Sequence, residues 1–256
     1  MPRLPHIVLT FCGALLAWPA LANLGAEVTL TSDYAFRGIS HSDGNPALQG
    51  SIYFQSEDSG LYTSVFATTT DLDTPTGEAR FEIDLSAGAQ GIVPLGVLPL
   101  LPEELTDSDW LGWDASLRYY FYPDSDARRG FDDFDFFEVS AGLSYHFDLF
   151  SGWTRIAYSP EFLGNLGEGR YYAGGLDVPL PMDFSVGGHV GYQDVAENNN
   201  GEHDTLDWSL SLTKTLRPDL SITAAYTDTD LRDASRCYYG SDACDARALI
   251  SITKRW

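Results

Sequence analysis

No long apolar run occurs in this sequence of 256 residues. A transmembrane helix needs about 18 or more consecutive apolar residues, and no stretch reaches that length. The mean hydropathy of −0.15 agrees with this absence. Both observations argue against a helical membrane protein.

Positive charge is also scarce. Lysine occurs only at Lys214 and Lys254, and 15 Lys and Arg against 37 Asp and Glu give a formal net charge of −22. So acidic a chain is not a natural partner of nucleic acid. The surplus indicates exposed loops that repel anions, although it does not by itself identify a ligand. We expect no bound cofactor.

The first 22 residues have the pattern of a secretory signal peptide. Arg3 supplies the positive start, Ile7–Trp18 is a short apolar core, and Ala20–Ala22 is a small-x-small cleavage site. A lipoprotein signal at Cys12 is disfavoured because bulky Phe11 precedes it. We expect cleavage after Ala22, which leaves one mature domain, residues 23–256.

Cleavage would leave two cysteines, Cys237 and Cys244, close together in a polar loop. In an exported protein this spacing favours a disulfide. Two exposed free thiols are the alternative, which an oxidising compartment disfavours. Metal binding is weaker still, since no histidine lies nearby.

What the sequence does contain is alternation of apolar and polar residues from Val28 to Trp256. Met182 and Phe184, for example, alternate with Asp183 and Ser185. Side chains on a strand point to opposite faces in turn, so each segment is a strand with one apolar and one polar side. The segments run about ten to twelve residues, the length that crosses a bilayer at a tilt, whereas soluble strands average about five or six. The pattern predicts an all-β fold, a closed antiparallel transmembrane β-barrel of about 12 strands.

The strand boundaries are read from where the alternation starts and stops. The seventh strand is among the least regular, because Pro160 weakens its end. The predicted strands are Val28–Arg37, Ala47–Glu57, Leu61–Thr70, Glu78–Ala89, Leu111–Tyr122, Phe134–Phe147, Trp153–Phe162, Gly169–Asp177, Met182–Asp194, Thr205–Leu216, Leu220–Leu231 and Arg247–Trp256.

The connections alternate between short turns and longer polar loops, as outer-membrane barrels require. Gly38–Pro46 is one of the longer loops that we place outside, and Val178–Pro181 is one of the short inner turns. Gln90–Trp110 is the exception, a long inward connection with an apolar segment, Ile92–Pro102, that contains three prolines. A flap at the membrane interface and a plug inside the barrel both remain open for it.

Aromatic residues cluster near the strand ends, which is typical of the two aromatic girdles of such barrels. The last strand alternates up to Trp256, an ending that resembles the signal by which bacterial outer-membrane barrels are recognised by their assembly machinery. The clustered aromatics are Tyr34, Phe36, Tyr119–Tyr122, Phe134–Phe137, Trp153, Tyr171, Tyr172 and Trp256.

Several stretches resemble the TorF-type porin family of bacterial outer-membrane proteins, most strongly residues 31–50. The resemblance covers nearly the whole mature chain and implies an outer-membrane β-barrel and a pore, without a defined solute. The Ile92–Pro102 segment looks like an insertion relative to the family. The other matching stretches are Tyr119–Pro123, Phe137–Glu138, His189–Tyr192, Tyr226–Asp230 and Cys237 with Cys244–Arg247.

Charged residues on the inward parity are candidates to line the lumen. Asp33 and Arg37 would share a face near the outer mouth. The favoured interpretation is an internal ion pair that braces the wall, and the alternative is a constriction that orients a solute. The candidate pore-lining residues are Asp33, Arg37, Arg80, Glu82, Asp84, Asp114, Arg118, Glu138, Asp207 and Arg255.

Three other motifs carry little chemistry. His41–Asp43 contains the residue types of a hydrolase triad, but three sequence neighbours in a loop favour a turn. His146 and His189 are isolated inward histidines, for which a structural role is favoured over metal binding. The acidic run Asp132–Asp135 lacks the spacing and the glycine of a calcium loop.

We therefore expect a pore in the bacterial outer membrane for passive diffusion of small polar solutes, with a mild cation preference. Twelve strands lie between filled eight-stranded barrels and open barrels of sixteen or more, so the bore should be narrow. A structural or adhesive barrel with a blocked lumen is one alternative, and a barrel enzyme is another, although no nucleophile and base are evident. The expected partners are outer-membrane lipid, the assembly machinery and small solutes, and the oligomeric state stays undetermined.

Overall fold

The structure is a computed structural model, and it describes residues 22–56, 58–74, 77–94, 110–127, 134–147, 149–163, 166–196, 204–231, 237 and 242–256. The predicted signal peptide, apart from Ala22, lies outside these residues. So does the larger part of the predicted Ile92–Pro102 segment, together with Asp132 and Asp133. Within the described part of the chain, no helix is long and apolar enough to span a membrane.

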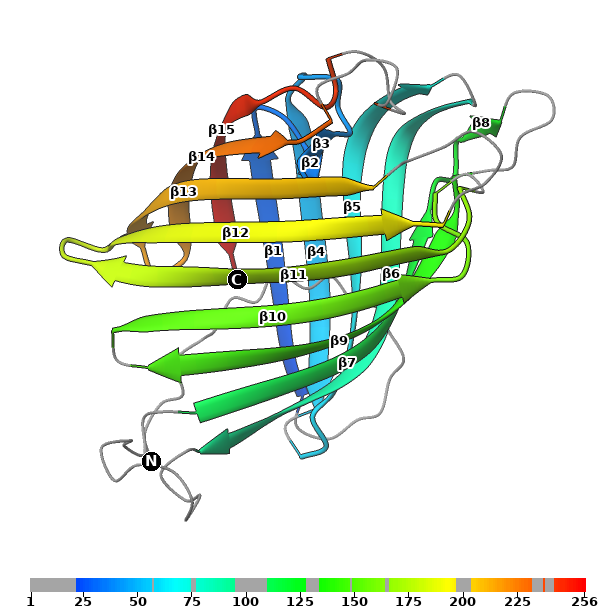
Figure 1. The fold of residues 1–256 in the computed structure, drawn as a ribbon. Coiled ribbons are helices and arrows are strands. Elements are labelled where there is room, and N and C mark those ends of the chain that lie inside the picture. Colours follow the sequence, from blue (N-terminus) through cyan, green and yellow to red (C-terminus); the bar gives the residue numbers. More distant parts are fainter. Residues whose placement is uncertain are drawn as a thin grey trace.

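Long antiparallel strands make up almost all of the described chain (Figure 1). Three further strands, β2 (Ala35–Phe36), β3 (Ile39–Ser40) and β8 (Asp126–Ala127), are only two residues long. The long strands are β1 (Ala22–Thr31), β4 (Ala47–Ser56), β5 (Leu61–Thr74), β6 (Gly77–Pro94), β7 (Trp110–Phe121), β9 (Phe136–Phe147), β10 (Phe150–Ser159), β11 (Gly169–Leu180), β12 (Phe184–Val195), β13 (Thr205–Arg217), β14 (Leu220–Thr229) and β15 (Arg247–Arg255).

The twelve long strands close into a barrel. Each pairs antiparallel with its neighbours in the chain, and β1 pairs both with β4 and with the final strand, β15. The closing register places Glu27 opposite Arg255 and Thr29 opposite Thr253. Closure leaves no unpaired edge. The predicted closed antiparallel barrel of about 12 strands is confirmed.

The wall has its apolar side chains outside and its polar side chains inside. On β7, Leu117 is 50% exposed while its neighbour Ser116 is 7% exposed. On β9, Val139 is 51% exposed while Glu138 is 2% exposed. A water-soluble fold does the reverse, so this inversion is the property of a barrel whose outer surface faces lipid.

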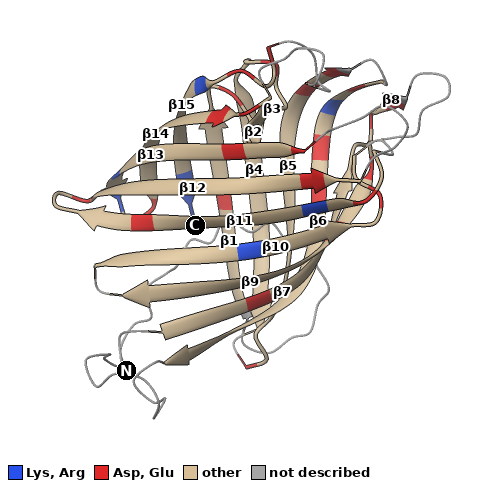
Figure 2. Cartoon of the chain, in the orientation of Figure 1, with Lys and Arg blue, Asp and Glu red and all other residues tan. Residues whose placement is uncertain are grey.

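The connections differ between the two ends of the barrel (Figure 1). We call the end with the β4–β5, β9–β10, β11–β12 and β13–β14 turns the short-turn end, and the opposite end the long-loop end. Acidic residues of the connections gather at the long-loop end (Figure 2). β1 begins at Ala22 and β15 ends at Arg255, and both of these residues lie at the short-turn end.

Several predicted boundaries change for physical reasons. The β11–β12 turn contains Met182 and Asp183, both at positive φ (62° and 57°), so Met182 belongs to the turn and the predicted Val178–Pro181 turn is wrong. β10 ends at Ser159, directly before Pro160, as proline cannot continue the ladder. β6 continues to Pro94, opposite Trp110 of β7, so the start of the Ile92–Pro102 segment belongs to the wall.

The largest difference is in the first predicted strand, Val28–Arg37. β1 ends at Thr31, and the chain then forms the two-stranded hairpin β2–β3 with Arg37 and Gly38 at its tip. The predicted exposed loop Gly38–Pro46 is also wrong at its start. Ile39 and His41 are 2% and 1% exposed, so this part of the connection is folded inward rather than standing in solvent.

Candidate functional site

The β2–β3 hairpin crosses the lumen near the long-loop end. Its turn has two residues, since Phe36 pairs with Ile39, and both Arg37 (φ 50°) and Gly38 (φ 79°) have left-handed backbone. Two-residue hairpins favour this type I′ geometry because it matches the twist of the strands. A Cβ on Gly38 would lie 2.6 Å from Thr229 Cγ2 and 3.0 Å from Asp207 Cβ, so only glycine lets the tip approach β13 and β14 this closely.

Arg37 connects the hairpin tip to the opposite wall. Its Nη2 lies 2.6 Å from Glu138 Oε1 on β9, and its Nη1 donates to Gln193 Oε1 on β12. Its guanidinium also lies 4.0 Å from the ring centre of Tyr171 on β11, a cation–π contact. β1, which leads into the hairpin, pairs with none of these strands. The hairpin and the Arg37 side chain together therefore reach across the lumen.

Two groups on the hairpin keep fixed protonation states. Burial lowers the pKa of the Arg37 guanidinium. The Glu138 carboxylate beside it raises that pKa, and the net effect of the surroundings is upward, so the group stays charged. Burial and the neighbouring Glu82 carboxylate raise the pKa of the Tyr34 phenol well above its ordinary value. Tyr34 is therefore a neutral donor, and its hydroxyl donates to Glu82 Oε1 at 2.9 Å.

Asp33 holds the base of the hairpin together. Its Oδ1 accepts hydrogen bonds from the hydroxyls of Ser40 (2.6 Å) and Ser42 (2.7 Å). Its Oδ2 lies 2.5 Å from Arg247 Nη1, at the start of β15. A buried ion pair of this kind costs about 3–5 kcal/mol when one partner is removed. The carboxylate thus fixes the angle at which the hairpin leaves the wall.

A second buried carboxylate, Glu82 on β6, contacts Tyr34 and His41, which lie on either side of the hairpin in the sequence. The Tyr122 hydroxyl donates to Glu82 Oε2 at 2.9 Å, and His41 Nδ1 lies 3.5 Å from the same oxygen. Next on the same face, Asp84 Oδ2 lies 3.6 Å from Arg118 Nη1. Charged groups inside the barrel are therefore paired or hydrogen-bonded at this level, which is what makes their burial tolerable.

Aromatic side chains fill the space that these polar contacts leave. Tyr120 and Phe136 stack with ring centres 4.1 Å apart, and Phe162 meets Phe136 edge-on at 5.1 Å. Phe36 of the hairpin packs on Tyr120 at 5.7 Å. Several predicted girdle aromatics thus face the lumen rather than the lipid, and that prediction is wrong for them. They are Tyr34, Phe36, Tyr120, Tyr122, Phe134, Phe136 and Tyr171.

Toward the short-turn end the lumen is lined by several glycines and serines together with Trp153 and His189. One row across the sheet reads Gly112, Ser144, Trp153, Gly175, His189 and Ser209 by register. In it, Trp153 and His189 stack at 5.7 Å over Gly175, where a Cβ would lie 2.7 Å from Trp153 Nε1. Apart from Gly112, these inward residues are partly exposed, whereas those around the hairpin are buried. The inward side chains are therefore more accessible toward the short-turn end than around the hairpin.

Most of the predicted lumen charges lie inside the barrel. Glu82, Asp84, Glu138 and Asp207 are at most 2% exposed at or near the hairpin level. Nearer the short-turn end, the hydroxyl of Tyr62 donates to Asp114 Oδ2 at 2.6 Å, and Arg255 Nε lies 2.7 Å from Glu27 Oε2. Asp33 and Arg37 do not pair with each other, because the hairpin turns one toward Arg247 and the other toward Glu138.

Arg80 is the exception, and its assignment to the lumen is wrong. The β5–β6 ladder shifts register between Thr69 and Leu72, and this bulge reverses which face the β6 side chains occupy. Ala79 is fully buried, whereas the Arg80 side chain is 51% exposed and pairs with Asp71 and Glu78.

Sequence reasoning missed several lumen residues. Tyr171, Gln193 and Arg155 lie on the inward parity of β11, β12 and β10, so a complete parity assignment could have found them. Arg155 Nη2 donates to Ser140 Oγ at 2.8 Å. Arg247 is different, because nothing local at the start of the last strand indicates a partner in the first connection.

The other sequence motifs hold no catalytic arrangement. The hydroxyl of Ser42 donates to Asp33, and the ring of His41 faces Glu82, so both residues serve the hairpin. His189 Nε2 lies 3.0 Å from the Tyr171 hydroxyl and 3.5 Å from Asp207 Oδ1. No group of three metal-ligating side chains occurs within the described ranges.

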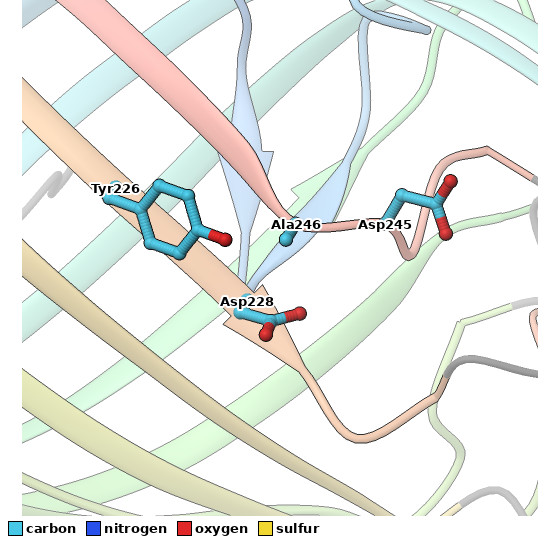
Figure 3. A pocket seen from close by; sticks show the side chains of 4 residues that line it. All are labelled: Tyr226, Asp228, Asp245 and Ala246. Atoms are coloured by element: carbon cyan, nitrogen blue, oxygen red, sulfur yellow. The ribbon is translucent and has the colours of Figure 1, made fainter.

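A pocket of about 400 Å³ lies beside the hairpin tip, since the carbonyl of Asp228 in its lining would be 3.4 Å from a Cβ on Gly38 (Figure 3). It is lined by Tyr226 and Asp228 of β14 and by Asp245 and Ala246, which precede β15. Tyr226 is 43% exposed on the outer surface of the wall. We therefore take the lumen, and not this pocket, as the candidate site.

Cys237 and Cys244 form a disulfide with Cα atoms 5.9 Å apart. Cys244 is fully buried, and the hydroxyl of Thr229 donates to its carbonyl at 3.0 Å. The disulfide thus packs at the end of β14, next to the place where the tip of the hairpin meets Thr229.

Comparisons with known proteins agree with this architecture. No curated protein matches the chain by sequence. Among solved structures, the NanC porin shares 10% identity over 91% of this chain and 98% of its own, with a TM-score of 0.54. The KdgM porin, solved in complex with disordered oligogalacturonate, shares 8% identity over 91% and 98%, with a TM-score of 0.50. At such identities the likeness concerns the fold alone.

The sequence itself matches one family model over residues 20–256, almost its whole length. The chain therefore belongs to the family described as "Bacterial protein of unknown function (Gcw_chp)".

Proposed function

We propose that the protein is a pore in the bacterial outer membrane for passive diffusion of small polar solutes. The observation that carries the proposal is the inverted wall, apolar outside and polar inside, whose inward side chains are partly exposed toward the short-turn end. The likeness of the fold to solved porins supports it. We also propose that the protein is related to the TorF-type porins, and this part of the proposal rests on the sequence motifs alone.

The location follows from the same reasoning. β-Strands span a bilayer only as a closed barrel, in which every backbone polar group is hydrogen-bonded and the outer surface faces lipid. Export by the signal peptide of residues 1–22 and recognition of the last strand by the assembly machinery complete the proposed route. We propose no enzymatic activity, because the polar side chains of the lumen bind one another in the pairs described above.

We further propose a mild cation preference. Acidic residues surround the long-loop end, and they raise the local cation concentration at a narrow mouth. The preference is mild because some are neutralised, as Asp71 is by Arg80. The described acidic residues of this end include Asp71, Asp73, Asp124, Asp126, Asp242 and Asp245, whereas Asp132, Asp133, Glu197 and Glu202 lie outside the described residues.

This charge argues against a polyanionic solute. The KdgM structure contains oligogalacturonate, an acidic saccharide. A chain with a net charge of −22 and an acidic long-loop end would repel such a molecule. We therefore propose neutral or cationic small solutes for this protein.

A liposome-swelling assay tests the proposal. Purified mature protein in phospholipid vesicles should speed the entry of neutral sugars, with the rate falling steeply as the sugar grows. Detergent-solubilised protein should migrate differently on a gel before and after boiling, as a control for folding. Swelling no faster than in protein-free vesicles, with folded protein present, would contradict a pore.

One observation favours a second candidate, a structural barrel with a closed lumen. Ile39, Tyr120 and Glu82 are all nearly inaccessible at the hairpin level. A barrel that stays closed there would not conduct, whereas a pore requires the hairpin to leave space. The absence of swelling together with normal folding would favour this candidate.

A further inference from the structure

We propose that the β2–β3 hairpin is the closing element of the pore and that Arg37 is its latch, so that one side chain sets both bore and charge selectivity. This inference rests on the proposed pore function. It names a specificity-determining residue that the barrel architecture alone does not assign.

The wall of the barrel is complete without the hairpin tip. β1 and β4 pair from Ala22 opposite Ser56 to Thr31 opposite Ala47, and the hairpin is inserted between the ends of this ladder. Its own ladder has only two residue pairs. The tip could therefore move away from β9, β11 and β12 without breaking any hydrogen bond of the wall.

The base is better anchored than the tip. Ser40 N donates to Ala243 O, and His41 O accepts from Asp71 N, while Asp33 pairs with Arg247. The tip instead reaches the opposite wall through the Arg37 guanidinium, which Glu138, Gln193 and Tyr171 surround. The hairpin thus has a hydrogen-bonded base, and its tip has one charged contact group in addition to the packing of Phe36 on Tyr120 and of Gly38 on Thr229.

The residue type at the tip supports a role beyond the turn. The first position of a type I′ turn favours Asn, Asp or Gly, because the left-handed conformation strains other residues. Arg37 occupies that position at φ 50°. Turn formation does not explain an arginine here, whereas the contact with Glu138 does.

The same contact balances charge at the narrowest level. The side chains around the guanidinium are the Glu138 carboxylate, the Gln193 amide, and the neutral phenol of Tyr171, with the Tyr120 hydroxyl on the other carboxylate oxygen. Removing Arg37 alone would take away the ion-pair partner of Glu138 and leave Arg155 as the remaining cation near this carboxylate, so the opening would become more negative by one charge. Such a charge favours cations over anions.

Planar-bilayer recording of the wild type and four variants tests this inference. Arg37→Asn keeps a residue that the turn prefers but removes the latch, so misfolding does not explain its effect. Glu138→Gln removes the partner, and the double variant removes both charges. Lys214→Gln is the matched control, because it breaks an ion pair with the exposed Asp183 at the β11–β12 turn, at the short-turn end and away from the hairpin.

We expect Arg37→Asn to raise single-channel conductance several-fold over the wild type and to shift the reversal potential toward cations. The double variant should keep the high conductance and return the selectivity to near the wild-type value. Glu138→Gln should also raise conductance, without an added cation preference, and Lys214→Gln should leave conductance unchanged.

Wild-type conductance in Arg37→Asn would overturn the latch while leaving the pore intact. Higher conductance with unchanged selectivity in both Arg37→Asn and the double variant would overturn the assignment of charge selectivity to Arg37. Silence of all the proteins, each folded by the gel-shift criterion, would overturn the pore function itself. A silent wild type with a conducting Arg37→Asn would support the latch.

Discussion

Asp33 and Arg247 lie 214 residues apart in the sequence, yet their side chains meet at 2.5 Å at the base of the hairpin. The pair joins the first connection of the chain to its last strand, at the seam where β1 and β15 close the barrel. Its position means that closing the barrel and placing the hairpin in the lumen are coupled.

Replacing Asp33 should therefore loosen the hairpin and weaken the seam. Asp33→Ala leaves Arg247 buried without its carboxylate and removes the acceptor of Ser40 and Ser42, so we expect a loss of about 3–5 kcal/mol. Asp33→Asn retains an acceptor oxygen and should lose less. Urea unfolding in lipid vesicles measures the difference, and equal stability of all three proteins would contradict the role of the pair.

The disulfide should be formed in the mature protein and should act locally. Cys237 and Cys244 are separated by seven positions. So short a closed loop restricts the unfolded chain by only about 2–3 kcal/mol. Thiol labelling of unfolded mature protein should give no signal before reduction and two labelled cysteines after it. Full labelling without reduction would contradict the bond.

The exposed apolar face should meet lipid. Leu117, on the outer face of β7, is 50% exposed next to Val139 of β9. An arginine near the middle of a lipid-facing strand costs about 2–4 kcal/mol, so Leu117→Arg should destabilise the folded barrel in vesicles by that amount. Leu117→Phe, which stays apolar, is the matched control. If both variants unfold at the wild-type urea concentration, this face does not contact lipid.

The cation preference should weaken with salt. The Debye length is about 10 Å at 0.1 M salt, comparable to a narrow mouth, and about 3 Å at 1 M. Reversal potentials under a potassium chloride gradient should therefore favour potassium at low salt and approach neutrality at high salt. Anion selectivity at low salt would contradict this prediction and would indicate that lumen arginines such as Arg37, Arg118 and Arg155 determine the ion selectivity.

The fold could be predicted from the sequence because the strands of a barrel in lipid carry a local signal. Each strand alternates over its full length, so the period of two alone indicates both its existence and its two faces. Boundaries were less certain where a turn residue also fits the alternation. Met182 is apolar on the correct parity, and only its positive φ places it in a turn.

The hairpin could not be predicted in the same way. Asp33, Ala35 and Arg37 continue the parity of β1, so the alternation passes without interruption over the bend at Ser32. An arginine gives no turn signal at the first position of a type I′ turn. The contacts that hold the hairpin, to Glu82, Glu138 and Arg247, are all distant in sequence. The lumen charges were therefore predictable by parity, whereas their partners were not.

Single-channel recording of the wild-type mature protein in a planar bilayer tests the central claim most directly. A narrow pore with the hairpin across its lumen should give small, discrete current steps at constant voltage, in protein that is heat-modifiable on a gel. If folded wild-type protein and folded Arg37→Asn both produce no current steps at any voltage, the barrel is not a pore.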